Sequence, residues 1–242
     1  LCQRVGLQAI YMTGNAYPNG NVPVNHAWNI VHIDGKYYYA DPTFDDGMTA
    51  GSDVVEISVK CDFHETFHML RADFRPNLSF DTVKCDIQMG TIERSAKEET
   101  PLEKAQFEIC AHKYVDVSDS EIGFSLLNNG KYGHRVKNGL ISLNLLRSPV
   151  YPDRHADRGK HEFTYALYGH RGKLSVETLK RAYQLNKPLL QFTGDHLPCP
   201  LVRSTNETVV VETIKKANGK DALVIRLFES QGKDAVTGIE TG

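Results

Sequence analysis

The feature that most constrains the fold is a long succession of short segments in which apolar and polar residues alternate. Such segments, rich in β-branched and aromatic residues, are typical of strands with one face buried. The turns between them include Asn129-Gly130, Asn138-Gly139 and Asn218-Gly219, and Asn-Gly pairs favour tight turns. Only VETLKRAYQLN, residues 176–186, has a clearly helical pattern, with its apolar residues on one face. The sequence therefore predicts a mainly β fold, a large antiparallel β-sandwich. The strand segments are VVEISVKCDF, HMLRADFRP, TVKCDIQMG, FEICAHKYVDV, IGFSLLN, ISLNLL, HEFTYALY, TVVVETIKK and ALVIRLFES.

The first fifty residues follow a different pattern. LQAIYMTG reads as a strand, and NHAWNIVHI and KYYYAD read as two strands joined by Asp34-Gly35, a pair that suits a tight hairpin. A stretch of small residues from Met48 to Asp53 predicts a domain boundary. We therefore expect a partial α+β segment over residues 1–50 and the sandwich over residues 51–242, truncated at its C-terminal end.

Composition excludes several classes of function. The chain has 242 residues and a net charge of -2, which gives no electrostatic reason to expect binding to nucleic acid or to an anionic membrane. It has no apolar run of the ~20 residues that span a bilayer. Its five cysteines are scattered, which argues against a disulfide framework and favours a reducing, cytoplasmic location. The chain begins with Leu1, inside a domain, so a native targeting signal is expected to be absent from it.

His26 and Asp41 form the first candidate site. A tight hairpin brings the start of one strand to the end of the other, and a carboxylate can fix the tautomer of a histidine base. The segment HAWNIVHIDGKYYYADPTFDD, with LCQRVGLQAIYMTG before it, resembles the transglutaminase-like superfamily of cysteine enzymes. The resemblance implies that His26 and Asp41 belong to a Cys-His-Asp triad. Cys2 falls near the end of the preceding helix, so we expect the nucleophile upstream of residue 1 and an idle pair here.

From about Ser52 onward the chain resembles the C-terminal region of α-mannosidases of glycoside hydrolase family 38. The resemblance rests on blocks in order, among them DIQMGTIER, FEICAHKYVDVSD, GFSLLNNGKYGH and LLRSPVYPDRHADRGKHEFTYALYGH. It implies a retaining glycosidase that acts on mannose-containing oligosaccharides with two carboxylates and a bound zinc ion. In the family these groups sit in an N-terminal α/β barrel. We therefore expect the zinc ligands and the catalytic barrel outside this chain, and no metal site within it.

Loops between the strands supply the candidate substrate-binding residues. Arg147 enters a loop dense in charge and could donate paired hydrogen bonds to sugar hydroxyls. Alternatively, Arg147 pairs with Asp153 or Asp157 to fix that loop. The next candidates lie on the NNGKYG turn, and two more flank Gly159 and could hold the loop: Asn128, Lys131 and Tyr132, then Asp157 and His161. His64, His68 and the carboxylates Asp62, Glu65, Asp81 and Asp86 are interpreted as surface groups.

Three functions remain open on the sequence alone. The chain is a piece of an α-mannosidase, a piece of a transglutaminase-like cysteine enzyme, or a non-catalytic carbohydrate-binding or scaffold module. Coverage favours the first, while the expected absence of the catalytic carboxylates predicts that this chain alone is inactive.

Overall fold

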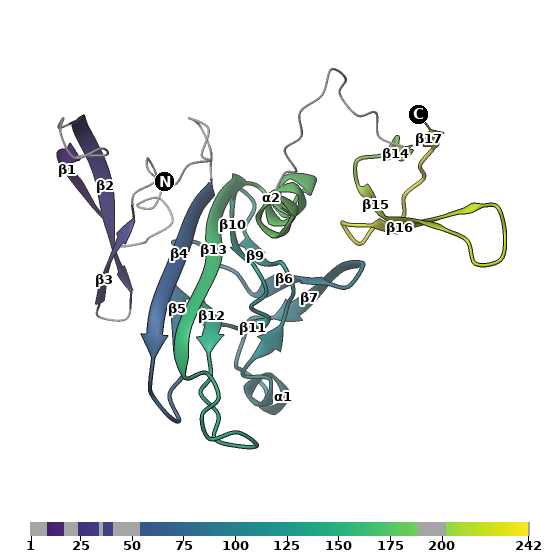
Figure 1. Cartoon of the computed structure of the whole chain (residues 1–242). Coiled ribbons are helices and arrows are strands. Elements are labelled where there is room, and N and C mark those ends of the chain that lie inside the picture. Colours follow the sequence, from purple (N-terminus) through teal and green to yellow (C-terminus); the bar gives the residue numbers. More distant parts are fainter. Residues whose placement is uncertain (1–8, 17–23, 34–35, 41–53, 188–201, 242) are drawn as a thin grey trace.

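Two antiparallel sheets form the centre of the chain in the computed structural model (Figure 1). The structure describes residues 54–187 and 202–241, and the strands within residues 9–40 as backbone only: β1 Ala9–Ala16, β2 Val24–Ile33 and β3 Lys36–Ala40. The larger sheet has six strands in the order β4-β13-β10-β9-β6-β7, and the smaller has four in the order β5-β12-β11-β8. The larger sheet comprises β4 Val54–Phe63, β6 Thr82–Ile87, β7 Gly90–Ser95, β9 Tyr114–Ser118, β10 Ile122–Asn128 and β13 Gly159–Arg171. The smaller comprises β5 Leu70–Phe74, β8 Ile109–Cys110, β11 Gly133–Lys137 and β12 Leu140–Leu146.

The main hydrophobic core lies between these two sheets. Phe74 and Leu143 of the smaller sheet belong to the same buried cluster as Phe124 and Leu126 of the larger one. The rings of Phe74 and Tyr165 pack edge to face, 6.0 Å apart, an arrangement that aromatic pairs favour. This contact between inner faces is the defining feature of a β-sandwich.

Helix α2, Val176–Asn186, covers the outer face of the six-stranded sheet. Its N-cap Ser175 accepts a hydrogen bond from the Glu177 backbone N–H, which satisfies one of the free donors at a helix start. Leu179 and Ala182 of the helix pack against Leu127 and Tyr168 of the sheet. Strand β10 is therefore buried on both faces. A second helix, α1 Pro101–Ala105, is short and starts with a capping box between Thr100 and Glu103.

Two small two-stranded sheets complete the described C-terminal part. They pair β14 Val202–Ser204 with β17 Ile239–Thr241, and β15 Val209–Lys216 with β16 Leu223–Glu229. Tyr183 of α2 donates a hydrogen bond from its hydroxyl to Glu212, at 2.8 Å. Thr91 of β7 donates to the backbone oxygen of Ser230, at 3.2 Å. These contacts attach the β15–β16 hairpin to the sandwich.

The prediction of a mainly β fold with an antiparallel sandwich is confirmed. Strands β4 and β10 and helix α2 have the predicted bounds, and β2 and β3 pair antiparallel as predicted for the hairpin. The sequence prediction missed β7, β8 and β11 as separate strands and α1 as a helix. None of the helices in the described residues is long and apolar enough to cross a membrane.

Candidate functional site

Strand pairing gathers most of the predicted substrate-binding residues at one end of the sandwich. Phe63 at the end of β4 pairs with Gly159 at the start of β13, and Leu146 at the end of β12 pairs with Leu70 at the start of β5. Asn128 at the end of β10 pairs with Tyr165, midway along β13, and Lys131 of the following turn reaches the ring of Phe163, which is nearer to the start of β13. We call this the rim end. Its three connections are residues 64–69, 129–132 and 147–158, and the last of these hangs below the sheets in Figure 1.

Asp157 closes the long connection between β12 and β13. Its Oδ2 accepts the backbone N–H groups of Arg147 and Ser148, at 2.9 and 2.8 Å. These hydrogen bonds from Ser148 and Arg147 lower the pKa of Asp157, because they stabilise its charged form. His161 reaches the backbone oxygen of Asp157 through Nε2, at 2.8 Å. Asp157 and His161 therefore hold the loop in place.

The connection 64–69 is hydrogen-bonded to the same loop. Ser148 donates its hydroxyl to the backbone oxygen of Glu65 at 2.7 Å, and the Phe67 N–H donates to the backbone oxygen of Ser148 at 3.2 Å. Arg158 adds a hydrogen bond to the hydroxyl of Thr66, at 3.1 Å. These hydrogen bonds join the two connections near both ends of the long loop.

The guanidinium of Arg147 is available to a ligand. The sequence left open an ion pair with Asp153 or Asp157, but in the part of the chain that the structure describes Arg147 makes no ion pair. Its contact with Asp157 uses the backbone N–H alone. The side chain is exposed at the entry of the anchored loop. Arg147 can therefore present its planar set of donors to a polar ligand.

Two of the three predicted residues on the NNGKYG turn are accessible to a ligand. Asn128 is fully buried; its amide donates to the His112 backbone oxygen at 2.7 Å, and its carbonyl accepts the Lys131 N–H at 2.8 Å. Asn128 therefore shapes the turn and has no free surface for a ligand. Lys131 lies with Nζ 4.9 Å from the centre of the Phe163 ring. Tyr132 is 54% exposed, and its ring lies 5.2 Å from that of His112.

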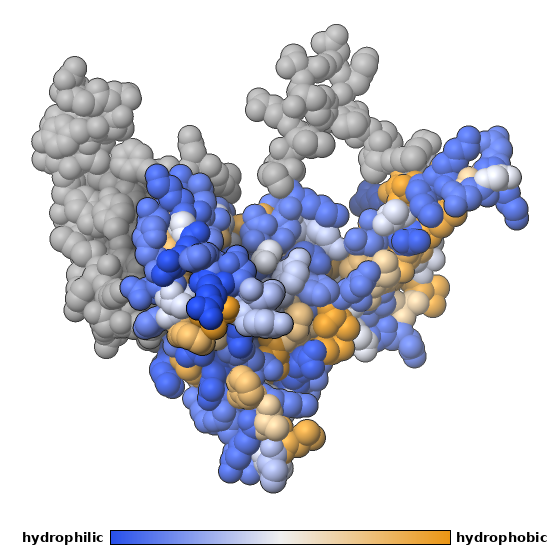
Figure 2. Space-filling view, turned by 60° about the horizontal axis from the view of Figure 1, so that its bottom comes forward, coloured by the Kyte–Doolittle hydropathy of each residue, from blue (hydrophilic) through white to orange (hydrophobic). Residues whose placement is uncertain are grey.

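Two exposed aromatic residues were missed by the sequence prediction. Phe67 is 79% exposed and Tyr151 is 86% exposed. Phe67 also has a φ of 60°, a backbone conformation that costs free energy for a bulky residue. Rings this exposed bury little apolar area, so they contribute little to folding. Figure 2 brings this end forward and shows a mainly hydrophilic face with separate apolar spots.

A metal ion has no evident place in the described residues. No group of three or more His, Cys, Asp or Glu side chains there could hold one. His64 lies 2.8 Å from Asp62 and His68 lies 3.6 Å from Glu65, as two separate exposed pairs. These pairs offer too few ligands for a zinc site. The zinc implied by the mannosidase resemblance thus does not fit the residues that the structure describes.

A buried polar cluster elsewhere contains the residue types of a hydrolytic triad. Ser125 and His170 both bond to the same carboxylate oxygen of Asp116, at 2.5 and 2.7 Å. Burial disfavours the charged imidazole, but the hydrogen bond and the charge of Asp116 outweigh it and raise the pKa of His170. Because His170 bonds to the aspartate and not to Ser125, it cannot take the serine proton. The cluster is structural.

Of the first candidate pair, His26 lies in β2, where it pairs with Gly14 of β1. The described β2–β3 ladder ends at Asn29 and Ala40. Asp41 and Cys2 lie outside the described residues. The predicted contact between His26 and Asp41 therefore lies outside what the structure describes.

The chain is similar to known α-mannosidases in sequence. The model of the glycosyl hydrolases family 38 C-terminal domain matches residues 31–155. Alpha-mannosidase G of Dictyostelium discoideum is 33% identical over 231 residues, which cover 92% of this chain and 20% of the relative. Alpha-mannosidase 2C1 of Homo sapiens is 34% identical over 194 residues, 76% of this chain and 19% of the relative. The chain thus spans about a fifth of the length of these relatives.

Solved structures share the fold. An α-mannosidase from Enterococcus faecalis V583 has a TM-score of 0.68 at 15% identity, over 97% of this chain and 29% of that chain. A second family 38 protein from Enterococcus faecalis has a TM-score of 0.66 at 16% identity, over 91% of this chain and 26% of that chain. At this identity the likeness concerns the fold alone.

The comparisons give no support to the transglutaminase resemblance of residues 1–50. The family match begins at residue 31, inside that segment. A match over 92% of 242 residues leaves about 20 residues outside it, so it also includes much of residues 1–50. The short His-Trp and tyrosine motifs that suggested a cysteine enzyme are ordinary strand sequences in β2 and β3.

Proposed function

Because the chain belongs to the family of the glycosyl hydrolases family 38 C-terminal domain, we propose that it is the β-sandwich region of a retaining α-mannosidase. In this proposal the rim end flanks the site where mannose-containing oligosaccharides bind. The catalytic barrel is the partner that supplies the two carboxylates and the zinc ion. The sandwich supplies binding and orientation, which are the roles that its described side chains can fulfil.

The observation that carries this proposal is the anchored loop with a free arginine. Asp157 and Ser148 fix the backbone on both sides of Arg147, while the guanidinium has no partner among the described residues. Sugar hydroxyls and catalytic carboxylates both accept hydrogen bonds from such a group. We assign Arg147, Lys131 and Tyr132 to contacts with substrate, Phe67 and Tyr151 to apolar contacts at its edge, and Asn128, Asp157 and His161 to positioning.

A chimera tests this role. In it, the present chain replaces the matching fifth of alpha-mannosidase G from Dictyostelium discoideum. We expect the chimera to hydrolyse an aryl α-mannoside, and Arg147→Ala to lower kcat/KM about 10- to 100-fold, because a charge-assisted hydrogen bond is lost. Arg226→Ala, at an exposed arginine of β16, is the matched control and should leave kcat/KM unchanged. Equal kcat/KM in the two variants would refute the role of Arg147.

We further propose that residues 1–50 and residues 51–242 form separate domains and that the protein is cytoplasmic. Cys61, Cys85 and Cys110 are free thiols, which suits a reducing compartment. No observation in the described residues favours a transglutaminase-like enzyme, since Asp41 lies outside them and the nucleophile is expected upstream of residue 1. A carbohydrate-binding module without catalysis agrees with the same rim residues, and the chimera separates it from the enzyme role.

A further inference from the structure

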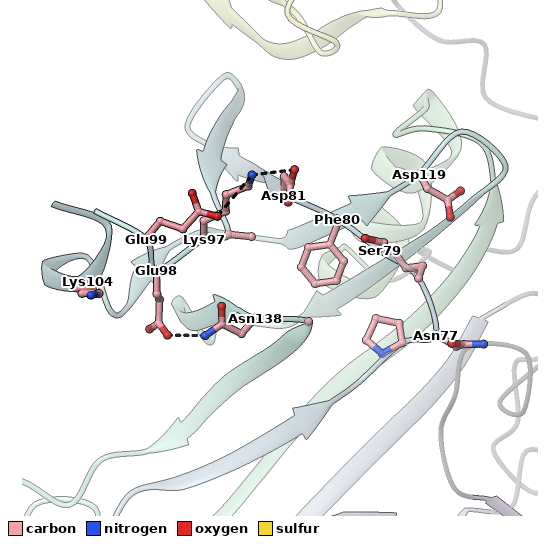
Figure 3. A pocket seen from close by; sticks show the side chains of 14 residues that line it. Asn77, Ser79, Phe80, Asp81, Lys97, Glu98, Glu99, Lys104, Asp119 and Asn138 are labelled. Atoms are coloured by element: carbon pink, nitrogen blue, oxygen red, sulfur yellow. Dashed lines mark hydrogen bonds and ion pairs between the residues drawn. The ribbon is translucent and has the colours of Figure 1, made fainter. Parts of the chain in front are cut away.

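A second recess lies at the end of the sandwich opposite the rim end. Thr82 at the start of β6 pairs with Ser95 at the end of β7, and Lys137 pairs with Leu140 across the β11–β12 turn. The connections at these strand ends enclose a groove of about 1030 Å³ between residues 76–81, residues 96–99 and the turn at 138–139 (Figure 3). A volume of this size accommodates two or three sugar units or a small organic molecule.

The walls of this groove are fixed before any ligand arrives. The Ala96 N–H donates to the backbone oxygen of Asp81 at 2.8 Å, and the Asn138 N–H donates to that of Ala96 at 3.2 Å. The Asn138 amide also donates to Glu98, at 2.6 Å. These bonds join all three segments. A pre-formed site loses little conformational entropy on binding, so weak polar contacts are enough to hold a ligand.

The charges of the groove disfavour anionic ligands. It is lined by four carboxylates and two lysines. Lys97 pairs with Asp81 at 3.1 Å, and Glu98 pairs with Arg135 at 2.9 Å. The pairing of Lys97 with Asp81 and the excess of carboxylates leave no cationic cradle for phosphate or nucleic acid. A neutral ligand rich in hydroxyl groups can donate hydrogen bonds to the carboxylates without bringing charge into the groove.

Three residues of the segment 77–80 offer groups for such a ligand. The side chains of Asn77 and Ser79 are exposed and make no hydrogen bond to the other described residues. Phe80 packs against the main core and also lines the groove. In Figure 3 its ring stands near the middle of the group, with Asn138 and Asn77 on either side. An aromatic ring beside amide and carboxylate groups can cover the apolar C–H face of a pyranose while its hydroxyls are hydrogen-bonded.

We propose that this groove binds a neutral oligosaccharide, with one pyranose packed on Phe80 and hydroxyls bonded to Asn77, Ser79 and Asp81. The site is separate from the rim end and needs no catalytic barrel. It therefore does not depend on the function proposed above. Its role is to hold glycan at a point distant from Arg147.

Titration followed by amide chemical shifts tests this site. The 242-residue chain is titrated with an α-linked mannotriose and with maltotriose at millimolar concentrations. We expect shifts at residues 77–81, 96–99 and 138–139. Asn77→Ala and Ser79→Ala should each weaken binding about 3- to 10-fold, the effect of one lost hydrogen bond. Phe80→Ala should weaken it about 10-fold or more. If Phe80→Ala fails to fold, the two exposed variants still decide the question.

Controls separate this groove from the rim end. Asn129→Ala changes an exposed asparagine at the rim end, and Arg147→Ala removes the rim cation; both should leave groove affinity unchanged. Inorganic phosphate and spermidine serve as charged probes. The proposal is overturned if neither trisaccharide shifts the groove amides, if the Asn77 and Ser79 variants bind as tightly as the parent, or if only a charged probe binds there.

Discussion

At the scale of single residues, Gly123 shows how the buried polar cluster dictates sequence. Gly123 pairs with His170 across strands β10 and β13. A Cβ atom at Gly123 would lie 2.0 Å from the imidazole Cε1 of His170, a distance at which one group must move. Only glycine leaves room for the ring that bonds to Asp116.

Gly123→Ala should therefore destabilise the chain by about 3 kcal/mol, because displacing His170 leaves the buried Asp116 carboxylate with Ser125 alone and without its cationic partner. Urea unfolding followed by circular dichroism measures this change. Gly90→Ala is the matched control, since nothing lies within 4 Å of a Cβ there, and its effect should stay below about 1 kcal/mol. Equal unfolding midpoints for the two variants would contradict the steric argument.

We expect the buried His134 to make the folded chain less stable in acid. Burial lowers the pKa of His134 to about 4, from an ordinary value of 6.5, although a backbone hydrogen bond to Tyr132 opposes the shift. Between these pH values the unfolded chain binds a proton at this site and the folded chain does not. Stability is therefore full above about pH 6.5 and falls, by about 3 kcal/mol from this group, as the pH drops towards 4.

Urea unfolding at about pH 7 and about pH 4.5 checks this prediction. His134→Asn keeps a donor near the Tyr132 carbonyl and removes the titrating ring. The difference in unfolding free energy between the two pH values should be smaller in this variant than in the parent. A difference of the same size would show that other groups cause the acid sensitivity. His170, whose pKa is raised, has the opposite sign: its contribution is lost as the pH rises through its folded pKa.

At the scale of elements, strand β10 shows what alternation can and cannot predict. Alternation in IGFSLLN predicts one face towards the core and one towards solvent. In the structure Leu126 faces the sandwich core and Leu127 faces α2. The second cover comes from residues fifty positions later in the chain, which no local pattern encodes.

Leu127→Ala should consequently cost as much as Leu126→Ala, about 2–4 kcal/mol each, because both side chains are fully buried. Thermal and urea unfolding of the two variants provide the comparison. Leu102→Ala, at a 67% exposed position of α1, is the control with little effect. If Leu127→Ala behaves like the control, α2 does not pack on this sheet in solution.

Other elements were predictable to different degrees. Helix α2 and strands β4 and β10 follow directly from periodicity. Strand β11, GHRVK, was missed because its buried members include His134 and Lys137, polar residues that hide the alternation. Lys137 is satisfied by the backbone oxygens of Ser95 and Lys97, contacts that only the folded chain creates. The Asn138-Gly139 turn, with φ values of 52° and 75°, suits a tight hairpin and could have revealed this strand.

The sequence also predicted the rim end only in part. Arg147 and the charged loop stand out in sequence, and a β-sandwich places alternate connections at one end. Phe67 has a positive φ and donates its N–H to the backbone oxygen of Ser148, which lies 81 positions later in the chain, so no local sequence signature marks it. The buried Asn128 donates a hydrogen bond to the backbone oxygen of His112, 16 positions earlier in the chain, a contact that no local pattern encodes.

At the scale of the whole molecule, the proposed function assigns binding groups to this chain and catalytic groups to a barrel outside it. Glycoside cleavage needs two carboxylates at a set separation around the bond. At the rim end one carboxylate oxygen of Asp157 accepts hydrogen bonds from two backbone N–H groups. The described residues contain no group of side chains that could hold a metal ion. In the proposed division of roles, the sandwich orients the glycan and the catalytic barrel supplies the groups that break its bonds.

The 242-residue chain alone should therefore show no turnover of an aryl α-mannoside, with or without added zinc, above a heat-inactivated sample. The same preparation should still bind mannotriose in the chemical-shift titration, so that inactivity is not mistaken for misfolding. The chimera with alpha-mannosidase G serves as the positive control for the assay, because it restores a catalytic barrel beside the rim end. Zinc-dependent turnover by the isolated chain would contradict this division of roles and would place the missing carboxylates within its own residues.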